Sequence, residues 1–231
     1  MTALDDLGAQ AGACAACALS ATRNTVVFGT GSPSADLVFV GEAPGRNEDE
    51  QGVPFVGAAG NLLNRLCSEV GIEREQVYIC NVLKCRPPGN RDPDPAEIEA
   101  CAPYLDRQLE LVDPLVVVSL GAFATRYLLG RPVGVTRVRG RRFRWRNDAT
   151  LVPTLHPAAV LRGGASKMKD ARDDFAVIRS TIDKARTYRV KRRAAEGTAR
   201  PDAVATGDAT EDPAVQATPM DADDAGQLGL F

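Results

Sequence analysis

The chain has 231 residues, of which 44% are hydrophobic and 25% charged, a balance typical of a soluble globular protein. No stretch approaches the roughly 18 consecutive apolar residues of a membrane span, and the N-terminus lacks the basic start and apolar core of a secretory signal. We therefore expect a cytoplasmic protein with no membrane partner, whose six cysteines are thiols or metal ligands rather than disulfides.

The net charge of −2 conceals an asymmetry along the chain. Seven of the 30 acidic residues but only one of the 28 basic residues lie from Gly197 onward, so residues 1–196 carry a net charge of +4. The C-terminal region is rich in Ala, Asp, Thr and Pro and has almost no large apolar residues, which predicts a disordered acidic linker over residues 191–226. The mildly basic remainder is suited to facing a polyanion.

Strand-like and helix-like segments alternate along the chain. Continuous apolar runs predict strands within residues 35–45, 76–85, 114–121 and 149–156. Helical spacing predicts helices within residues 58–72, 94–112, 122–130 and 170–189. Pro103 either kinks the second of these helices or starts another, and residues 138–145 are expected to pair with residues 149–156. Alternation with fully apolar strands predicts a three-layer α/β/α sandwich on a central, mostly parallel sheet.

In such sheets ligands bind beyond the carboxyl ends of the strands, so the loops that begin at Gly41, Asn81, Gly121 and His156 are expected to form the site. The loop after the first strand is rich in glycine, but it lacks both the P-loop ending and a dinucleotide fingerprint, and its acids would repel a triphosphate. Its glycines instead suit close approach to a flat ligand, with Phe55 available for stacking. The alternative is a solvated surface loop.

Four of the six cysteines are candidate metal ligands. Cys14 and Cys17 form a C-x2-C motif, Cys85 follows the second predicted strand, and Cys101 lies sixteen residues later. Both zinc and an iron–sulfur cluster accept four thiolates, and the spacing does not choose between them. Cys67 lies among leucines on a predicted helix and is expected in the core, as is Cys80 within a predicted strand.

Four motifs occur in order between Cys14 and about residue 186: "GEAPGRNEDE…PFVG", "ICNVLKCRPPGNRDP" with Cys101 downstream, "VVVSLGAFA" and "LHPAAVLR". Together they resemble a family 4 uracil-DNA glycosylase, the iron–sulfur branch of the uracil-DNA glycosylase superfamily. The resemblance implies an enzyme that flips uracil out of single- or double-stranded DNA and hydrolyses its N-glycosidic bond, leaving an abasic site. It further implies a monomer whose residues 1–190 form the catalytic domain.

The resemblance also implies a cofactor. Cys14, Cys17, Cys85 and Cys101 would hold a 4Fe–4S cluster with a structural role.

Recognition of uracil is assigned by the same resemblance. Phe55 matches the stacking aromatic residue. Asn81 matches the amide that reads the base, and cytosine would leave the hydrogen-bonding groups of this amide unpaired. Gly41, Glu42 and Ala43 match the first segment of the uracil-binding pocket.

Catalysis is assigned to His156, the only histidine, which matches the residue that donates to uracil O2 as negative charge develops there. Glu48 is the carboxylate nominated to orient water or to stabilise the cationic sugar, and Asp49 is the neighbour that could replace it.

DNA contacts are expected after His156. Pro157, Ala158 and Ala159 resemble a loop that enters the minor groove, Leu161 is the expected wedge, and Arg162 the expected phosphate contact. The basic residues within 137–146 either line the DNA face or form a solvated hairpin. Other candidate phosphate contacts flank Cys85, namely Lys84, Arg86 and Arg91.

Two other functions remain open at this stage. One is a family 5 type glycosylase with a broader base range, which the polar residues Glu42 and Glu48 disfavour. The other is a non-enzymatic iron–sulfur protein that binds DNA or senses redox state, in which Asn81, Phe55 and His156 would have no reason to converge.

The C-terminal residues 227–231, "QLGLF", resemble a short peptide by which DNA repair proteins dock on sliding clamps. Gln227 would bond backbone groups, and Leu228, Leu230 and Phe231 would fill an apolar groove. A disordered tether of this length would give a reach of about 30 Å. The alternative is a chance match at the end of the chain.

Deleting residues 227–231 is expected to abolish capture by an immobilised sliding clamp. Because the peptide would act only as a tether, uracil release from a free oligonucleotide should be unchanged. Equal clamp binding by the truncated protein, or loss of its activity on the free oligonucleotide, would contradict the tether.

Overall fold

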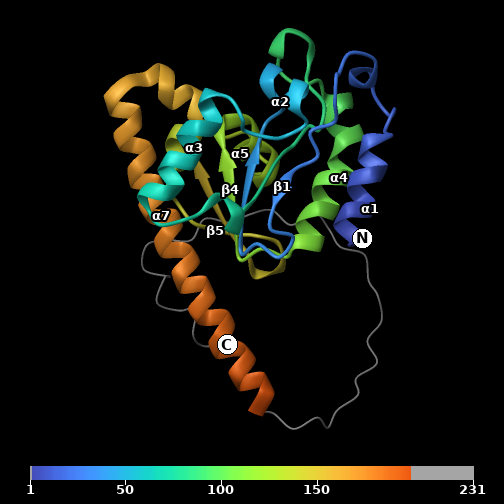
Figure 1. Ribbon diagram of the computed structural model, residues 1–231. Coiled ribbons are helices and arrows are strands. Elements are labelled where there is room, and N and C mark those ends of the chain that lie inside the picture. The colour runs from blue at the N-terminus through green and yellow to red at the C-terminus, as the bar shows by residue number, and fades with distance from the viewer. Residues whose placement is uncertain (1, 199–231) are drawn as a thin grey trace.

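A six-stranded sheet forms the centre of this computed structural model, in which residues 2–198 are described (Figure 1). The strand order is β1-β3-β2-β4-β6-β5. The strands are β1 (Thr30–Gly31), β2 (Leu37–Gly41), β3 (Tyr78–Asn81), β4 (Val116–Leu120), β5 (Phe143–Arg144) and β6 (Thr150–Thr154). The four central strands are parallel, and the edge strands β1 and β5 pair antiparallel with their neighbours. The mostly parallel sheet is confirmed.

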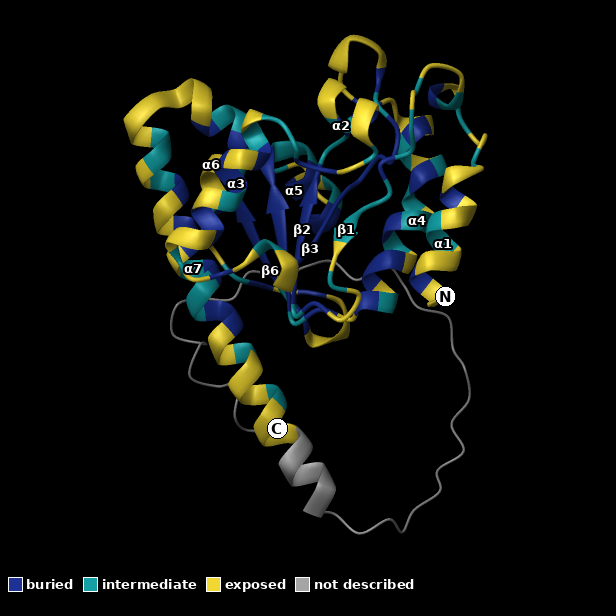
Figure 2. Cartoon of the chain, viewed as in Figure 1, coloured by how far each residue is buried: buried dark blue, intermediate teal, exposed yellow. Residues whose placement is uncertain are grey.

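Helices cover both faces of the sheet. They are α1 (Ala3–Gly12), α2 (Arg46–Gln51), α3 (Ala58–Glu69), α4 (Pro95–Val112), α5 (Gly121–Leu129), α6 (Val135–Val138) and α7 (Pro157–Thr198). One apolar cluster joins the sheet to α1, α4 and α5, and a second joins it to α3 and α7. Figure 2 shows the strands buried between helices whose outer sides are exposed. This is the three-layer sandwich expected from the sequence.

The central strands are buried because both of their faces meet helices. Val38 and Val40 of β2 belong to the cluster with α4 and α5, whereas Leu37 and Phe39 belong to the cluster with α3 and α7. Alternate residues of a strand point to opposite faces, which explains why the run is continuously apolar. Burying each such side chain contributes about 1.5–3 kcal/mol.

Pro103 lies inside the single 18-residue helix α4, from Pro95 to Val112, so it does not start another helix. Its start is fixed by a capping box, in which Asp94 and Glu97 each accept from the other's backbone N–H. Pro95 occupies the first helical position, where no N–H is needed.

Helix α7 is longer at both ends than the predicted 170–189. It begins at Pro157, is interrupted at Gly164 (φ 67°, ψ −156°), and continues to Thr198, past the expected domain end at residue 190. The minor-groove loop expected at residues 157–159 is therefore the first turn of a helix. Residues 199–226 of the predicted linker and the predicted clamp-binding peptide lie outside the described residues.

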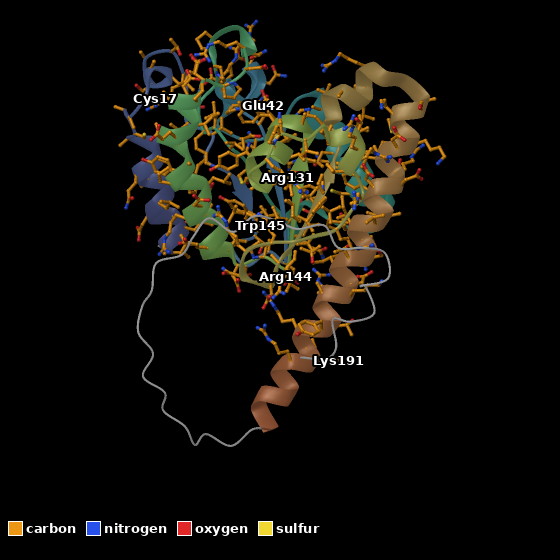
Figure 3. All side chains as sticks on the ribbon, turned by 180° about the vertical axis from the view of Figure 1, so that it is seen from behind. Cys17, Glu42, Arg131, Arg144, Trp145 and Lys191 are labelled. Carbon is orange, nitrogen blue, oxygen red and sulfur yellow. The ribbon has the colours of Figure 1, made fainter. Side chains whose placement is uncertain are left out.

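The basic hairpin does not face the carboxyl ends of the strands. Arg144 pairs with Thr150, the first residue of β6, and therefore lies at the end of the sheet opposite His156. Figure 3 shows Arg144 and Trp145 far from Glu42. The Trp145 ring is buried, and its Nε1–H donates to the Leu128 carbonyl at 3.0 Å. The hairpin as a DNA face is thus not supported.

Within residues 2–198, no helix has both the length and the apolar character needed to span a lipid bilayer.

Candidate active site and cysteine pocket

The predicted site residues gather at the carboxyl ends of the parallel strands. Gly41 ends β2 and Asn81 ends β3, and the two residues are partners in the parallel ladder. His156 follows the end of β6. Backbone hydrogen bonds from Val82 to the Gly41 carbonyl and from Leu83 to the Glu42 carbonyl, each 3.0 Å, continue the pairing beyond the strands. The first two loops of the site are therefore held together.

Phe55 closes this region from the segment between α2 and α3. Its ring centroid lies 5.7 Å from that of His156, with an interplanar angle of 33°. A Cβ at Gly41 would lie 2.8–2.9 Å from the Phe55 ring, so only glycine allows this approach. Phe55 has a φ of 55°, a left-handed conformation that side chains rarely adopt. Arg74 holds the preceding residue by donating to the Pro54 carbonyl at 2.8 Å.

The side chain of Asn81 is only 2% exposed, and its Oδ1 has no hydrogen-bond partner. A buried polar atom without a partner costs about 1–3 kcal/mol, and such atoms are rare in native proteins. A Cβ at Gly41 would collide with this oxygen, so the glycine allows Oδ1 to lie here. Asn81 therefore presents an unused acceptor next to the Phe55 ring.

His156 is held as a neutral imidazole. Burial and, to a smaller extent, the positive charge of Arg162 lower its pKa to about 4, although the negative charge of Glu48 opposes both effects. Its Nδ1 accepts from the Ala158 N–H at 3.2 Å, which assigns the remaining proton to Nε2. Gly121 (φ 92°) makes room for the ring, because a Cβ there would lie 2.8 Å from the His156 Cβ.

Glu48 anchors the Phe55 segment to α2. Its Oε1 accepts from the backbone N–H groups of Val56 (3.0 Å) and Gly57 (3.1 Å), immediately before α3 begins. Sequence reasoning missed this contact, because residue spacing does not show where the backbone N–H groups of a loop lie. The two hydrogen bonds engage one carboxylate oxygen and leave Oε2 outside them.

Asp49 does not replace Glu48. It is 1% exposed and accepts from the Asn24 N–H at 2.9 Å and from Asn24 Nδ2 at 2.7 Å. Its carboxylate therefore fastens α2 to the N-terminal segment rather than facing Phe55 and His156. The alternative catalytic role for Asp49 is disfavoured.

Glu42 and Ala43 continue the chain from β2 and are partly buried. Burial raises the pKa of Glu42, the negative charge of Asp92 raises it further, and Arg126 opposes the shift.

The expected DNA contacts differ in exposure. Leu161 is 48% exposed and Arg162 is exposed, whereas Pro157 is buried. Lys84 cannot contact phosphate, because it is 1% exposed. Arg91 pairs with Glu97 and with Asp94 at 3.2 Å.

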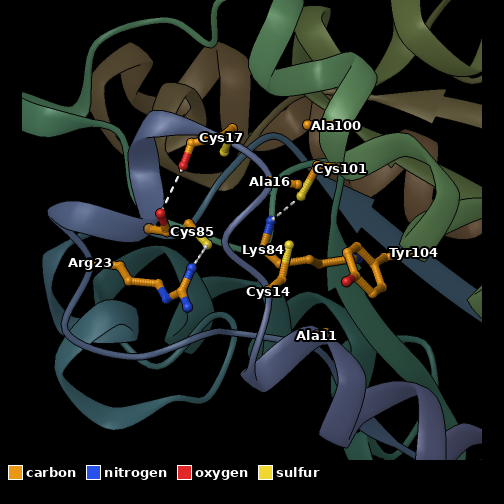
Figure 4. A pocket seen from close by; sticks show the side chains of 11 residues that line it. Ala11, Cys14, Ala16, Cys17, Arg23, Lys84, Cys85, Ala100, Cys101 and Tyr104 are labelled. Carbon is orange, nitrogen blue, oxygen red and sulfur yellow. Dashed lines mark hydrogen bonds between the residues drawn. The ribbon is translucent and has the colours of Figure 1, made fainter.

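The four candidate cysteine ligands line one pocket, which we call the cysteine pocket (Figure 4). Cys14 and Cys17 reach it from the N-terminal segment, Cys85 from the segment after β3, and Cys101 from α4. Its other lining residues are Ala11, Ala16, Ser20, Arg23, Lys84, Ala100 and Tyr104.

The two other cysteines lie in the packed core of the sheet and helices. Cys67 and Cys80 are buried there, as expected.

Hydrogen-bond donors reach two sulfur atoms of the cysteine pocket. The Lys84 N–H donates to Cys101 Sγ at 3.2 Å, and an Arg23 N–H donates to Cys85 Sγ at 3.5 Å. Burial raises the pKa of Cys85 to about 11, so a thiolate there needs a positive partner.

The four cysteines come to the pocket from three separate segments of the chain. Within residues 2–198, no three Cys, His, Asp or Glu side chains converge as the ligands of one metal ion would. An iron–sulfur cluster binds its thiolates at different iron atoms, so it needs no such convergence. Four cysteine thiols around one pocket are the donor set that an iron–sulfur cluster requires.

Residues 28–176 match the family model described as the uracil DNA glycosylase superfamily. A type-4 uracil-DNA glycosylase from Sulfurisphaera tokodaii is 42% identical over 198 residues, which cover 82% of this chain and 90% of the relative. Another from Archaeoglobus fulgidus is 47% identical over 168 residues, 70% of this chain and 84% of the relative. The chain belongs to the type-4 uracil-DNA glycosylases.

The match of this glycosylase to the type-5 branch is weaker. A type-5 uracil-DNA glycosylase from Thermus thermophilus is 34% identical over 118 residues, which cover 45% of this chain and 53% of the relative. The comparison favours the type-4 assignment over the broader type-5 alternative.

Proposed function

We propose that this enzyme excises uracil from DNA by hydrolysing its N-glycosidic bond, which leaves an abasic site and starts base excision repair. The observation that carries the proposal is the buried, unpartnered Oδ1 of Asn81 beside the Phe55 ring and the neutral His156, in a type-4 family member. An enzyme that acts on a base flips it out of the stack, holds it by stacking, and reads its pairing edge.

Asn81 reads the flipped base. Its Oδ1 accepts from uracil N3–H and its amide donates to O4, whereas cytosine presents the opposite pattern at those two positions. Phe55 stacks on the ring. Gly41, Glu42 and Ala43 line the pocket, and the absence of a Cβ at Gly41 lets Oδ1 and the Phe55 ring lie close to its backbone. A wrong base would leave the buried amide unpaired, which is the strongest source of discrimination available to such a site.

His156 stabilises the departing uracil. As the C–N bond breaks, negative charge develops on the base, chiefly at O2 and O4. The Nε2–H of a neutral imidazole donates to O2 and strengthens as the charge grows, so it lowers the barrier more than it stabilises bound substrate. Support comes from the lowered pKa of His156 and from the Ala158 N–H on its Nδ1.

Glu48 is the carboxylate that acts electrostatically on His156. The side chain of Ala43 cannot polarise water, and Asp49 is engaged elsewhere. With Oε1 held by the Phe55 segment, Oε2 of Glu48 is the oxygen that orients water or stabilises the cationic sugar.

DNA binds across the start of α7. Leu161, the exposed apolar side chain in the first turns of this helix, is the wedge that fills the place of the flipped base. Arg162 contacts phosphate and Pro157 supports the turn between them and His156. Substrates are uracil-containing single- and double-stranded DNA.

The four ligands Cys14, Cys17, Cys85 and Cys101 hold a 4Fe–4S cluster. When bound, the cluster supplies iron–thiolate bonds that cross-link the N-terminal segment, the segment after β3 and α4. This role is structural, because the residues of the uracil site carry the chemistry.

The C-terminal Gln227, Leu228, Leu230 and Phe231 dock on a sliding clamp. This proposal rests on the sequence alone, since these residues lie outside the described part of the chain.

Uracil release from oligonucleotides tests the function. The purified protein should release uracil from U·G duplex and from single strands, and His156→Ala should lower the single-turnover rate by about 10²–10³ while leaving the fold intact. Release of hypoxanthine or xanthine at comparable rates would favour the type-5 alternative. Absence of uracil release by the iron-loaded protein would favour a non-enzymatic DNA-binding role.

Two substitutions separate the charge of Glu48 from its anchoring contact. Glu48→Gln keeps an oxygen that can accept from Val56 and Gly57, so its thermal unfolding should match wild type while its single-turnover rate falls. Glu48→Ala removes both hydrogen bonds and should lower stability as well. A wild-type rate in Glu48→Gln would leave anchoring of the Phe55 segment as the whole role of this residue.

A matched pair of cysteine variants tests the ligand set. Cys85→Ser should lose the visible absorption of the cluster and much of its stability, whereas Cys67→Ser should retain the colour because Cys67 lies in the core. Iron content is measured for both proteins as purified. Equal iron in the two variants would overturn the assignment.

A further inference from the structure

Lys84 is a buried cation to which the proposed mechanism gives no task. It is 1% exposed, and among the described residues it is the only lysine in the buried class. Its Nζ donates to the backbone carbonyl of Asn81 at 2.7 Å. Burying an ammonium group is expensive, so a lysine in this position needs a physical reason.

The residue touches both the uracil site and the cysteine pocket. Its backbone N–H donates to Cys101 Sγ at 3.2 Å, its carbonyl accepts from the Val27 N–H at 2.8 Å, and its side chain ends on Asn81. Lys84 also lines the cysteine pocket beside Cys85 (Figure 4). A single residue therefore spans the distance between a candidate cluster ligand and the base-reading asparagine.

Lys84 has no carboxylate partner among the described residues, because none of their ion pairs involves it. Its side chain instead lines the cysteine pocket and ends on the Asn81 carbonyl. A 4Fe–4S cluster held by four thiolates in that pocket would place negative charge on the same side of Lys84.

The contact with Asn81 bears on how the amide is aimed. The Asn81 side chain leaves a backbone whose next two residues are fastened to the Gly41 and Glu42 carbonyls. The carbonyl of Asn81 itself is fixed by the Lys84 ammonium. With the backbone held at both points, Oδ1 stays in the site without a partner of its own.

We propose that Lys84 is a positioning residue that links the cluster-binding pocket to uracil recognition, by holding the Asn81 carbonyl from the cysteine side. The inference rests on the proposed role of Asn81 in reading uracil. It adds a function for the cysteine pocket, which would support the uracil site through this hydrogen bond as well as cross-link the chain.

Lys84→Met in the full-length, iron-loaded enzyme tests the link, because it removes the donor and keeps an apolar chain. Its iron content and visible spectrum should match wild type. The inhibition constant of free uracil should rise about tenfold to a hundredfold, the range expected for loss of a hydrogen bond made by a charged group. Arg23→Met is the control, since it removes the other cation that lines the cysteine pocket and has no bond to Asn81, and its inhibition constant should stay at the wild-type value.

The double variant decides whether Lys84 acts through Asn81. In an Asn81→Ala background, Lys84→Met should cause no further loss of uracil inhibition. An equal additional loss in that background, or iron loss as severe as in Cys85→Ser, would overturn the link. If Lys84→Met does not fold, Lys84→Gln is measured in its place against the same two backgrounds.

The two proposals fail in different ways. An unchanged inhibition constant in Asn81→Ala alone would remove the reading role of Asn81 and the link with it. Weakened uracil binding in Asn81→Ala, with wild-type binding in Lys84→Met, would remove the link alone.

Discussion

The parallel pairing of β2 with β3 is the constraint on which the site depends. This register puts Gly41 opposite Asn81, and the pairing continues into the loops through the Gly41 and Glu42 carbonyls. A slip of one residue would turn the Asn81 side chain to the other face of the sheet. Gly41 is required in this register because a Cβ there would collide with Asn81 Oδ1 and the Phe55 ring. The apolar residues of β2, divided between two helix layers, fix that register because any slip would exchange the faces they bury.

The electrostatics of the site follow from its burial. Groups that must read and stabilise a neutral base are themselves neutral, as the lowered pKa of His156 and the amide of Asn81 illustrate. The carboxylates near the site are held by hydrogen bonds. Glu48 accepts from backbone N–H groups of the Phe55 segment, and Asp49 accepts from Asn24 of the N-terminal segment. In such a water-poor site a preoriented N–H donor has a larger effect on developing charge than it would have in water.

Much of the fold could be predicted because the central strands are long apolar runs and the longer helices have clear spacing. Strand β1 has two residues and α2 six, too few for a periodic pattern. Helix α1 could have been found from its capping box at Thr2 and Asp5. The site residues were predictable as a group, since they follow parallel strands, but the contacts of Asp49 depend on distant backbone atoms that no local pattern reveals.

The central claim is that His156 acts as a neutral donor through Nε2–H, and its titration tests this most directly. Because the chain has one histidine, selective 15N labelling gives the resonances of a single ring. The account predicts a pKa of about 4 with the proton on Nε2, so that the ring stays neutral as pH falls from 8 to about 5 and gains charge only below that. A pKa near the ordinary value of about 6.5, or a neutral ring protonated on Nδ1, would contradict it.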